Sequence, residues 1–276
     1  MDVQKGRRML TAMMMAMLII PGCGWTSTNF SPEQVYRNAL AGIAGRESVK
    51  FQGQAGLRRN EENGYKDQFH YEGSLKDHDE LTLHTVLPVS GKEPGIQSMS
   101  ASGNSVTFAR LGSRWISLSG ESDTMHGTLA RFNPISQLEG LSTVPKRMTT
   151  EHSAARGTRM IRIELGPTEA HQWIAAQLSD EMSSIRRQYD QKASSQAGPE
   201  GNRVQQEMDQ VWDKGQQELV QMLNGAEASV VYHLTVDRSS SLPIRLSSES
   251  RLQYNDKNGR PQQESLVTDV NFEDYK

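Results

Sequence analysis

Histidine is the side chain that most often binds metals or transfers protons near neutral pH, and this 276-residue sequence contains seven. They lie at positions 70, 78, 84, 126, 152, 171 and 233, without a His-Glu-x-x-His motif or another dense ligand spacing. We expect His70, His84 and His233 to face solvent, because they fall on the polar side of alternating segments. His171, in the first turn of a predicted helix, is also expected at the surface. The sequence therefore predicts no metal site and no cofactor.

Motifs that position a catalytic nucleophile or a phosphate group are also missing from the sequence. It contains no Gly-x-Ser-x-Gly elbow, no P-loop and no Rossmann glycine fingerprint. A Ser-His-Asp set can assemble from distant residues, but no feature selects one, so we predict no catalytic residues and no enzyme. The acidic runs Glu61-Glu62 and Asp77-His78-Asp79-Glu80 lack the spacing of a calcium loop, and solvation of loops explains them.

The sharpest chemical signal is a thiol near the N-terminus. A short basic segment at positions 5–8 precedes twelve apolar residues at positions 9–20. This run is too short for a membrane span, which needs about 20 residues, but it fits the apolar region of a secretory signal peptide. Cys23 follows directly, and it is the only cysteine in the chain, which excludes an intramolecular disulfide framework.

The run Ile20-Pro21-Gly22-Cys23 resembles the lipobox of bacterial lipoproteins, although Pro21 departs from the usual small residue. That resemblance implies a signal peptide at residues 1–22 and lipidation of Cys23. The other reading is an ordinary signal peptide followed by a free thiol. Lipid chains on Cys23 would provide the several anchors that stable membrane attachment requires. Residues 23–30 would then be a polar tether.

The charge balance limits the partners of the chain. Thirty Lys and Arg residues against 33 Asp and Glu residues give a net charge of −3, which argues against general nucleic-acid binding and against attraction to anionic lipid heads. We therefore expect an extracytoplasmic protein whose lipid anchor holds it at the cell membrane. Gly24 gives no acidic retention signal, so the outer membrane remains open if the host has two membranes.

Beyond the tether, the pattern changes from helix to strands. Ser31-Pro32-Glu33-Gln34 predicts a capping box and the start of a helix that ends at Gly45. A period of two then predicts eight to ten antiparallel strands, each apolar on one side. A short helix is expected from Phe132 to Leu141. The strand segments are residues 49–57, 68–75, 81–87, 106–108, 148–152, 159–165, 230–236, 244–254 and 266–272, with a further one at Trp115.

Two long amphipathic helices interrupt the strands. The first begins at Gly166-Pro167, and its apolar stripe includes Leu178 and Met182. The composition of residues 194–201 predicts a loop, after which Asn202 is expected to cap a second helix that ends at Asn224-Gly225. The stripe of the second helix includes Met208, with Trp212 beside it.

These elements predict an α+β fold. A sheet of this size curls because strands twist with one hand, and amphipathic helices must cover its apolar face. We expect a curved antiparallel half-barrel packed on helices, with a long helical pair at about residues 167–224 inserted before the last three strands. Residues 31–276 are predicted to form a single domain, since no linker divides them.

The order SPEQVYRNAL, then FQGQ, then YHLTVDRSSSLPIRL and VTDVNFEDY resembles the LolA/LppX superfamily of envelope lipoproteins and lipid carriers. The resemblance implies a half-barrel that encloses a hydrophobic cavity between sheet and helices, with no catalytic motif. The candidate cavity residues are Phe51, Phe69, Tyr71, Leu83, Phe108, Trp173, Leu178, Met182, Met208, Trp212 and Tyr232.

Two classes of function remain open from the sequence. The first is a lipoprotein that binds a lipid or another hydrophobic ligand between sheet and helices. The second is a surface-anchored scaffold or regulator that binds an envelope protein through the helical pair or the outer sheet face.

Overall fold

The computed structural model describes residues 30–60, 64–65, 67–86, 105–111, 114–118, 131–152, 155–195 and 199–276. The predicted signal peptide and Cys23 lie outside these ranges. Residues Ser31–Lys276 form one compact unit. None of the helices in the described ranges combines the length and apolar character needed to cross a membrane.

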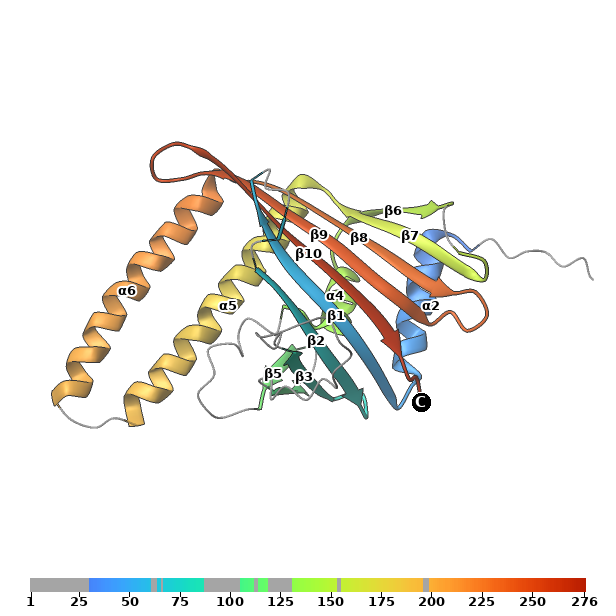
Figure 1. The fold of residues 1–276 in the computed structure, drawn as a ribbon, viewed down its shortest axis with the longest axis horizontal. Helices are drawn as coiled ribbons and strands as arrows, with labels where there is room; N and C mark the ends of the chain where they lie inside the picture. The colour runs from blue at the N-terminus through green and yellow to red at the C-terminus, as the bar shows by residue number, and fades with distance from the viewer. Residues whose placement is uncertain are drawn as a thin grey trace, which may run out of the picture. The chain divides into compact units, whose positions relative to one another are not determined.

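The unit is built on one open antiparallel sheet (Figure 1). Its strands are β1 (Ser48–Arg59), β2 (Asp67–Lys76), β3 (Glu80–Val86), β4 (Ser105–Leu111), β5 (Arg114–Ser117), β6 (Lys146–Glu151), β7 (Thr158–Leu165), β8 (Glu227–Asp237), β9 (Pro243–Asn255) and β10 (Pro261–Glu273). They lie in the order β5-β4-β3-β2-β1-β10-β9-β8-β7-β6. The sheet is curved, and its ten described strands with four described helices confirm the predicted α+β class.

The two ends of the unit meet in the middle of the sheet. β1 pairs with β10 over ten residue pairs, from Lys50 opposite Glu273 to Arg59 opposite Glu264. At this end the backbone of Ser48 exchanges two hydrogen bonds with Lys276, at 3.3 and 3.0 Å. The β1–β10 ladder therefore joins strands β1–β5 to strands β6–β10 in one sheet.

The first helix, α2 (Pro32–Ala44), confirms the predicted capping box. The Ser31 hydroxyl accepts from the Gln34 backbone N–H at 3.3 Å, and the Gln34 side chain accepts from the Ser31 N–H at 3.0 Å. These bonds satisfy two donors that a helix start would otherwise leave open. The apolar side of α2, with Val35, Tyr36 and Ile43, is buried against the sheet.

Three further helices complete the described fold. Helix α4 (Pro134–Leu141) ends at the predicted Leu141 but begins two residues after Phe132, because Asn133 caps it by accepting from the N–H groups of Ile135 and Ser136. The long helices are α5 (Pro167–Ser195) and α6 (Pro199–Asn224), which run side by side away from the sheet (Figure 1). The prediction that Asn202 caps the second helix was wrong, since α6 begins at Pro199. Proline suits the first helical turn because it has no N–H to leave unpaired, so the loop-like composition misled the prediction.

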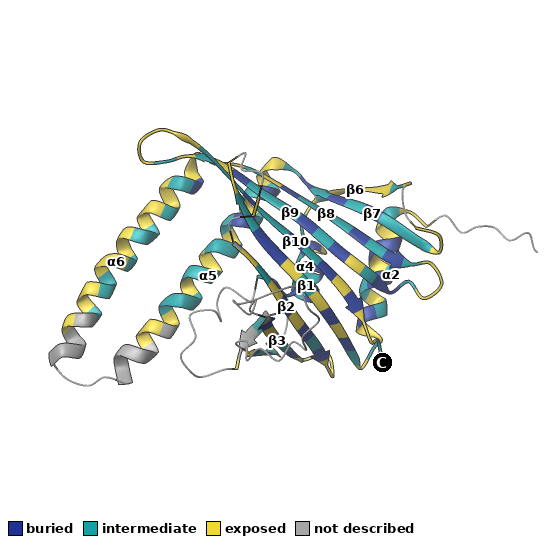
Figure 2. Ribbon diagram, viewed as in Figure 1, coloured by how far each residue is buried: buried dark blue, intermediate teal, exposed yellow. Residues whose placement is uncertain are grey.

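Burial alternates along the strands, as the period of two predicts (Figure 2). We call the apolar side, which packs against the helices, the inner face. On this face the glycines of β1 and β2 lie beneath aromatic rings of the neighbouring strand. A Cβ on Gly53 would lie 2.4 Å from Tyr71 Cζ, and a Cβ on Gly73 would lie 2.3 Å from Phe51 Cζ. These glycines let both rings lie close against the sheet.

The close packing of Gly73 against Phe51 can be tested by substitution. We expect Gly73→Ala to lower the free energy of unfolding by about 1–3 kcal/mol, because the new methyl group must displace the Phe51 ring. Gly215→Ala on α6 is the control, because its Cβ would meet nothing nearer than Met182 Cε at 3.8 Å. It should stabilise the protein by about 0.5–1 kcal/mol through helix propensity. Urea unfolding measures both, and an unchanged midpoint for Gly73→Ala would contradict the packing.

Candidate functional site

The inner face of the sheet gathers most of the predicted cavity residues. Phe51, Tyr71, Leu83, Phe108 and Tyr232 come from five different strands and are all at most 2% exposed. Phe69 is partly buried against them, and on α5 so are Trp173 and Leu178. These eight residues belong to one hydrophobic cluster, which forms where the strands turn the same side inward.

The other three predicted residues lie on the long helices. Met182, Met208 and Trp212 are half-buried. Met182 approaches Gly215 of α6, and the Arg186 guanidinium of α5 lies 5.8 Å from the Trp212 ring centroid. Met182 and Trp212 therefore contribute to the contact between α5 and α6.

Three aromatic rings form the centre of the inner face on the β2 side. Phe69 and Phe132 meet edge to face with centroids 4.7 Å apart. Tyr71 lies 5.9 Å from Phe69 and 5.8 Å from Phe132. The sequence predicts Phe132 only as the start of a short helix and does not predict this role, because the contacts of Phe132 to β2 bridge about sixty residues.

Most hydroxyl groups of the inner face have partners. Tyr36 donates to the Leu138 carbonyl, which ties α2 to α4. Trp173 Nε1 donates to the Tyr232 hydroxyl at 3.2 Å, which ties α5 to β8. Burial raises the pKa of the tyrosines at positions 36, 71 and 232 well above the usual range, so all three stay neutral at physiological pH.

The hydroxyl of Tyr71 differs, because it is buried and has no hydrogen-bond partner among the described residues. Trp115 Nε1 and Arg131 Nε are in the same situation. Leaving such a group unpaired costs about 1–3 kcal/mol. All three groups can donate a hydrogen bond, so they would suit a molecule that brings an acceptor oxygen among apolar side chains.

An ion pair holds α5 over this region. Arg131 Nη1 lies 3.0 Å from Glu181 Oε2, with side-chain exposures of 21% and 17%. The Arg131 guanidinium also lies 5.6 Å from the centroid of the Phe132 ring. Arg131 thus connects the long helix to the aromatic centre through charge and ring contact together.

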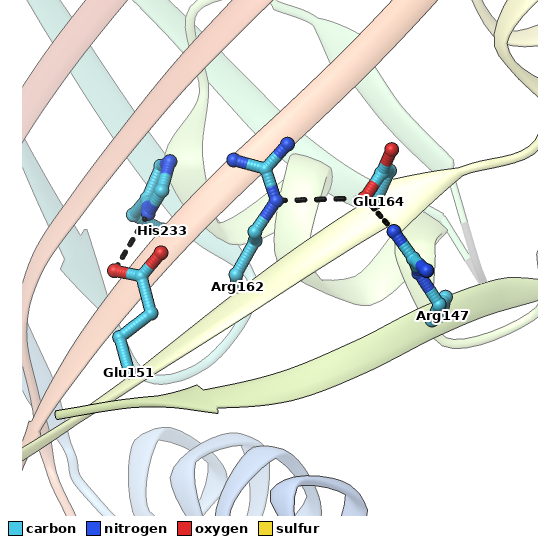
Figure 3. A network of polar contacts seen from close by, with 5 residues as sticks. All are labelled: Arg147, Glu151, Arg162, Glu164 and His233. Atoms are coloured by element: carbon cyan, nitrogen blue, oxygen red, sulfur yellow. Dashed lines mark hydrogen bonds and ion pairs between the residues drawn. The ribbon is translucent and has the colours of Figure 1, made fainter.

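The histidines lie mostly where the sequence predicted. His70 and His84 are exposed, and His233 belongs to a polar network on the outer face, where its Nδ1 lies 3.1 Å from Glu151 Oε2 (Figure 3). The expectation for His171 was wrong, since it is half-buried and its Nε2 lies 2.8 Å from the Leu223 carbonyl. This bond joins the start of α5 to the end of α6, a long-range contact that local sequence does not show.

The acidic run at residues 77–80 has a structural role. Asp77 and His78 adopt positive φ angles of 49° and 66° in the turn between β2 and β3. The Asp77 N–H donates to the Glu47 carbonyl at 2.8 Å. Over the described ranges, no group of three or more His, Cys, Asp or Glu side chains is placed to hold a metal ion.

No family model and no curated protein matches this chain. Solved structures that are similar to it include the following three. A structure concerned with lipid–protein interactions in lipovitellin shares 9% identity and covers 83% of this chain, with a TM-score of 0.40; this chain spans only 25% of that one. LprF from Mycobacterium bovis shares 8% identity, with 89% and 95% of the two chains covered and a TM-score of 0.38.

The third similar structure is the LolA superfamily protein NE2245 from Nitrosomonas europaea, at 12% identity. It covers 90% of this chain and 93% of its own length, with a TM-score of 0.28. At these identities and TM-scores the similarities carry no argument about a ligand or a partner. Ligand and partner must be inferred from the chain's own residues.

Two tyrosines allow a matched test of the inner face. Tyr36→Phe should lower the free energy of unfolding of ligand-free protein by about 1–2 kcal/mol, because it leaves the buried Leu138 carbonyl unpaired. Tyr71→Phe should raise it by up to about 1–3 kcal/mol, because the buried hydroxyl that it removes makes no hydrogen bond within the described structure. Urea unfolding measures the free energy of unfolding of both variants. A large decrease for Tyr71→Phe would show that the Tyr71 hydroxyl has a structural partner.

Proposed function

We propose that this chain is a non-enzymatic extracytoplasmic lipoprotein, anchored through Cys23, that binds an apolar ligand between the inner face of the sheet and its helices. The observation that carries the proposal is the buried hydroxyl of Tyr71, which lies within an aromatic cluster and has no hydrogen-bond partner among the described residues. A protein that only needed a solid core there would be served as well by phenylalanine. An acyl ester or carboxyl oxygen of a bound lipid would complete the missing hydrogen bond.

The surroundings of Tyr71 support a ligand that is mainly apolar. Phe69 and Phe132 flank the ring, and Tyr71 covers Gly53 of β1. On α5, Leu178 packs against the same core from a partly exposed position. Burial of apolar surface, at roughly 25 cal/mol per Å², would supply most of the binding free energy, while the single hydroxyl would orient the ligand.

Native mass spectrometry tests the ligand. Protein purified from its host should carry a copurifying amphiphile that organic solvent removes. Tyr71→Phe should weaken rebinding of that amphiphile about fivefold, the equivalent of one hydrogen bond of about 1 kcal/mol. Tyr65→Phe is the control, because Tyr65 is exposed and lies against Gly56 on the opposite side of β1. A homogeneous, ligand-free mass for the wild-type protein would refute the proposal.

The anchor has its own test. We expect Cys23→Ala to release the protein from the membrane into the soluble fraction, because its charge gives no attraction to anionic lipid heads. Fractionation of cells that express the wild-type chain and the variant measures this. A variant that stays in the membrane fraction as fully as the wild type would contradict anchoring through Cys23.

A further inference from the structure

The sheet ends at β6, and this edge has a composition suited to self-pairing. β6 pairs with β7 without a register shift, and among the described residues no strand pairs with its other side. Thr149 and Thr150 are both exposed although they point to opposite faces. Figure 1 shows β6 as the last strand at this margin. An unpaired edge offers a row of N–H and C=O groups to another strand.

The lysine of β6 does not block pairing at this edge. Lysine on an edge strand normally prevents pairing by placing a charge there. Here Lys146 lies on the inner side, with Nζ 5.5 Å from the centroid of the Tyr36 ring. The same Nζ donates to the Val144 carbonyl at 3.0 Å. The charge of Lys146 is thus held by its own chain, and β6 contains no proline that would block an edge.

We propose that β6 pairs antiparallel with β6 of a second copy of this chain, with Thr149 opposite Thr149. This register places Arg147 opposite Glu151 of the second copy, and Glu151 opposite its Arg147. All four side chains lie on the outer face, since positions 147, 149 and 151 share one side of the strand. Opposite charges directly across two strands stabilise the pairing.

Neighbouring registers lack this match. Moving the twofold axis to Met148 sets Arg147 opposite Thr149, and moving it to Thr150 sets Glu151 opposite Thr149. Of the three registers with the axis at residue 148, 149 or 150, only the one centred on Thr149 forms two opposite-charge pairs. It also keeps the inner faces of both copies on the same side, with Met148 opposite Thr150, so that the two sheets become continuous.

Both charged groups have capacity for a second partner. Arg147 is 73% exposed and uses Nη2 to contact Glu164 Oε2 at 2.8 Å, which leaves other N–H donors of the guanidinium (Figure 3). Glu151 contacts His233 through Oε2, and a carboxylate has two oxygens. In the dimer Arg147 would lie between Glu164 of its own chain and Glu151 of the second copy.

The pairing is expected to be weak in solution. Six residues on each side bury less than the 1,200–2,000 Å² of a typical stable interface, so we expect an affinity weaker than about micromolar. Confinement of both copies to a membrane raises their effective concentration, as linkage of two modules does. The dimer is thus suited to a protein held at a surface.

Disulfide capture tests the register, using the Cys23→Ala chain, which has no other cysteine. Thr149→Cys in this background should give a disulfide-linked dimer on mild oxidation, because opposed residues in an antiparallel pair have Cα atoms about 4.5–5.5 Å apart, within disulfide range. Gln52→Cys, exposed on the central strand β1, is the control and should stay monomeric.

Charge reversal tests the recognition. Arg147→Glu or Glu151→Arg should each reduce the yield of the Thr149→Cys dimer several-fold, and the double variant should restore it. Circular dichroism establishes that each variant remains folded. The proposal is overturned if Thr149→Cys gives no more dimer than Gln52→Cys, or if the folded double variant fails to restore the yield.

Discussion

The one-sided burial of antiparallel strands, closed by the β1–β10 ladder, is the constraint on which the rest of the structure depends. Each strand hides one side from water, and β1 and β10 bring the two halves of the chain into one sheet. Phe51 and Phe272 meet across this ladder with ring centroids 6.2 Å apart. Because the inner face is shared by all ten described strands, the four described helices have one large apolar surface to cover. The positions of the eight candidate residues in the hydrophobic cluster follow from that coverage.

The inner face serves as core and as candidate binding surface together. Where polar groups meet internal partners, as Tyr36 and Tyr232 do, they fix helices to the sheet. Where a polar group has no partner within the described part of the chain, as for the Tyr71 hydroxyl, its burial has a cost that a ligand could offset. Apolar residues look the same in a binding surface and in a solid core. The difference between these tyrosines is therefore the better criterion for a binding surface.

Local patterns in the sequence predicted the elements well. The capping box at Ser31 and the alternation in the strands depend on neighbouring residues, and the structure confirms them. The start of α6 at Pro199, the role of Phe132 and the contact of His171 with Leu223 were not predicted. The last two depend on residues that are distant in sequence, and so do the surroundings of the Tyr71 hydroxyl. The period of apolar residues does not show which groups meet across the fold.

Photoaffinity labelling would locate a bound lipid on the protein. A phospholipid with a photoactivatable acyl chain, irradiated with the purified protein, would mark the residues that surround the bound chain. We expect labels on the peptides that contain Phe69, Tyr71 and Phe132, with loss of label when unlabelled lipid competes. Labels confined to the outer face of the sheet, or insensitive to competition, would contradict a ligand held between the sheet and its helices.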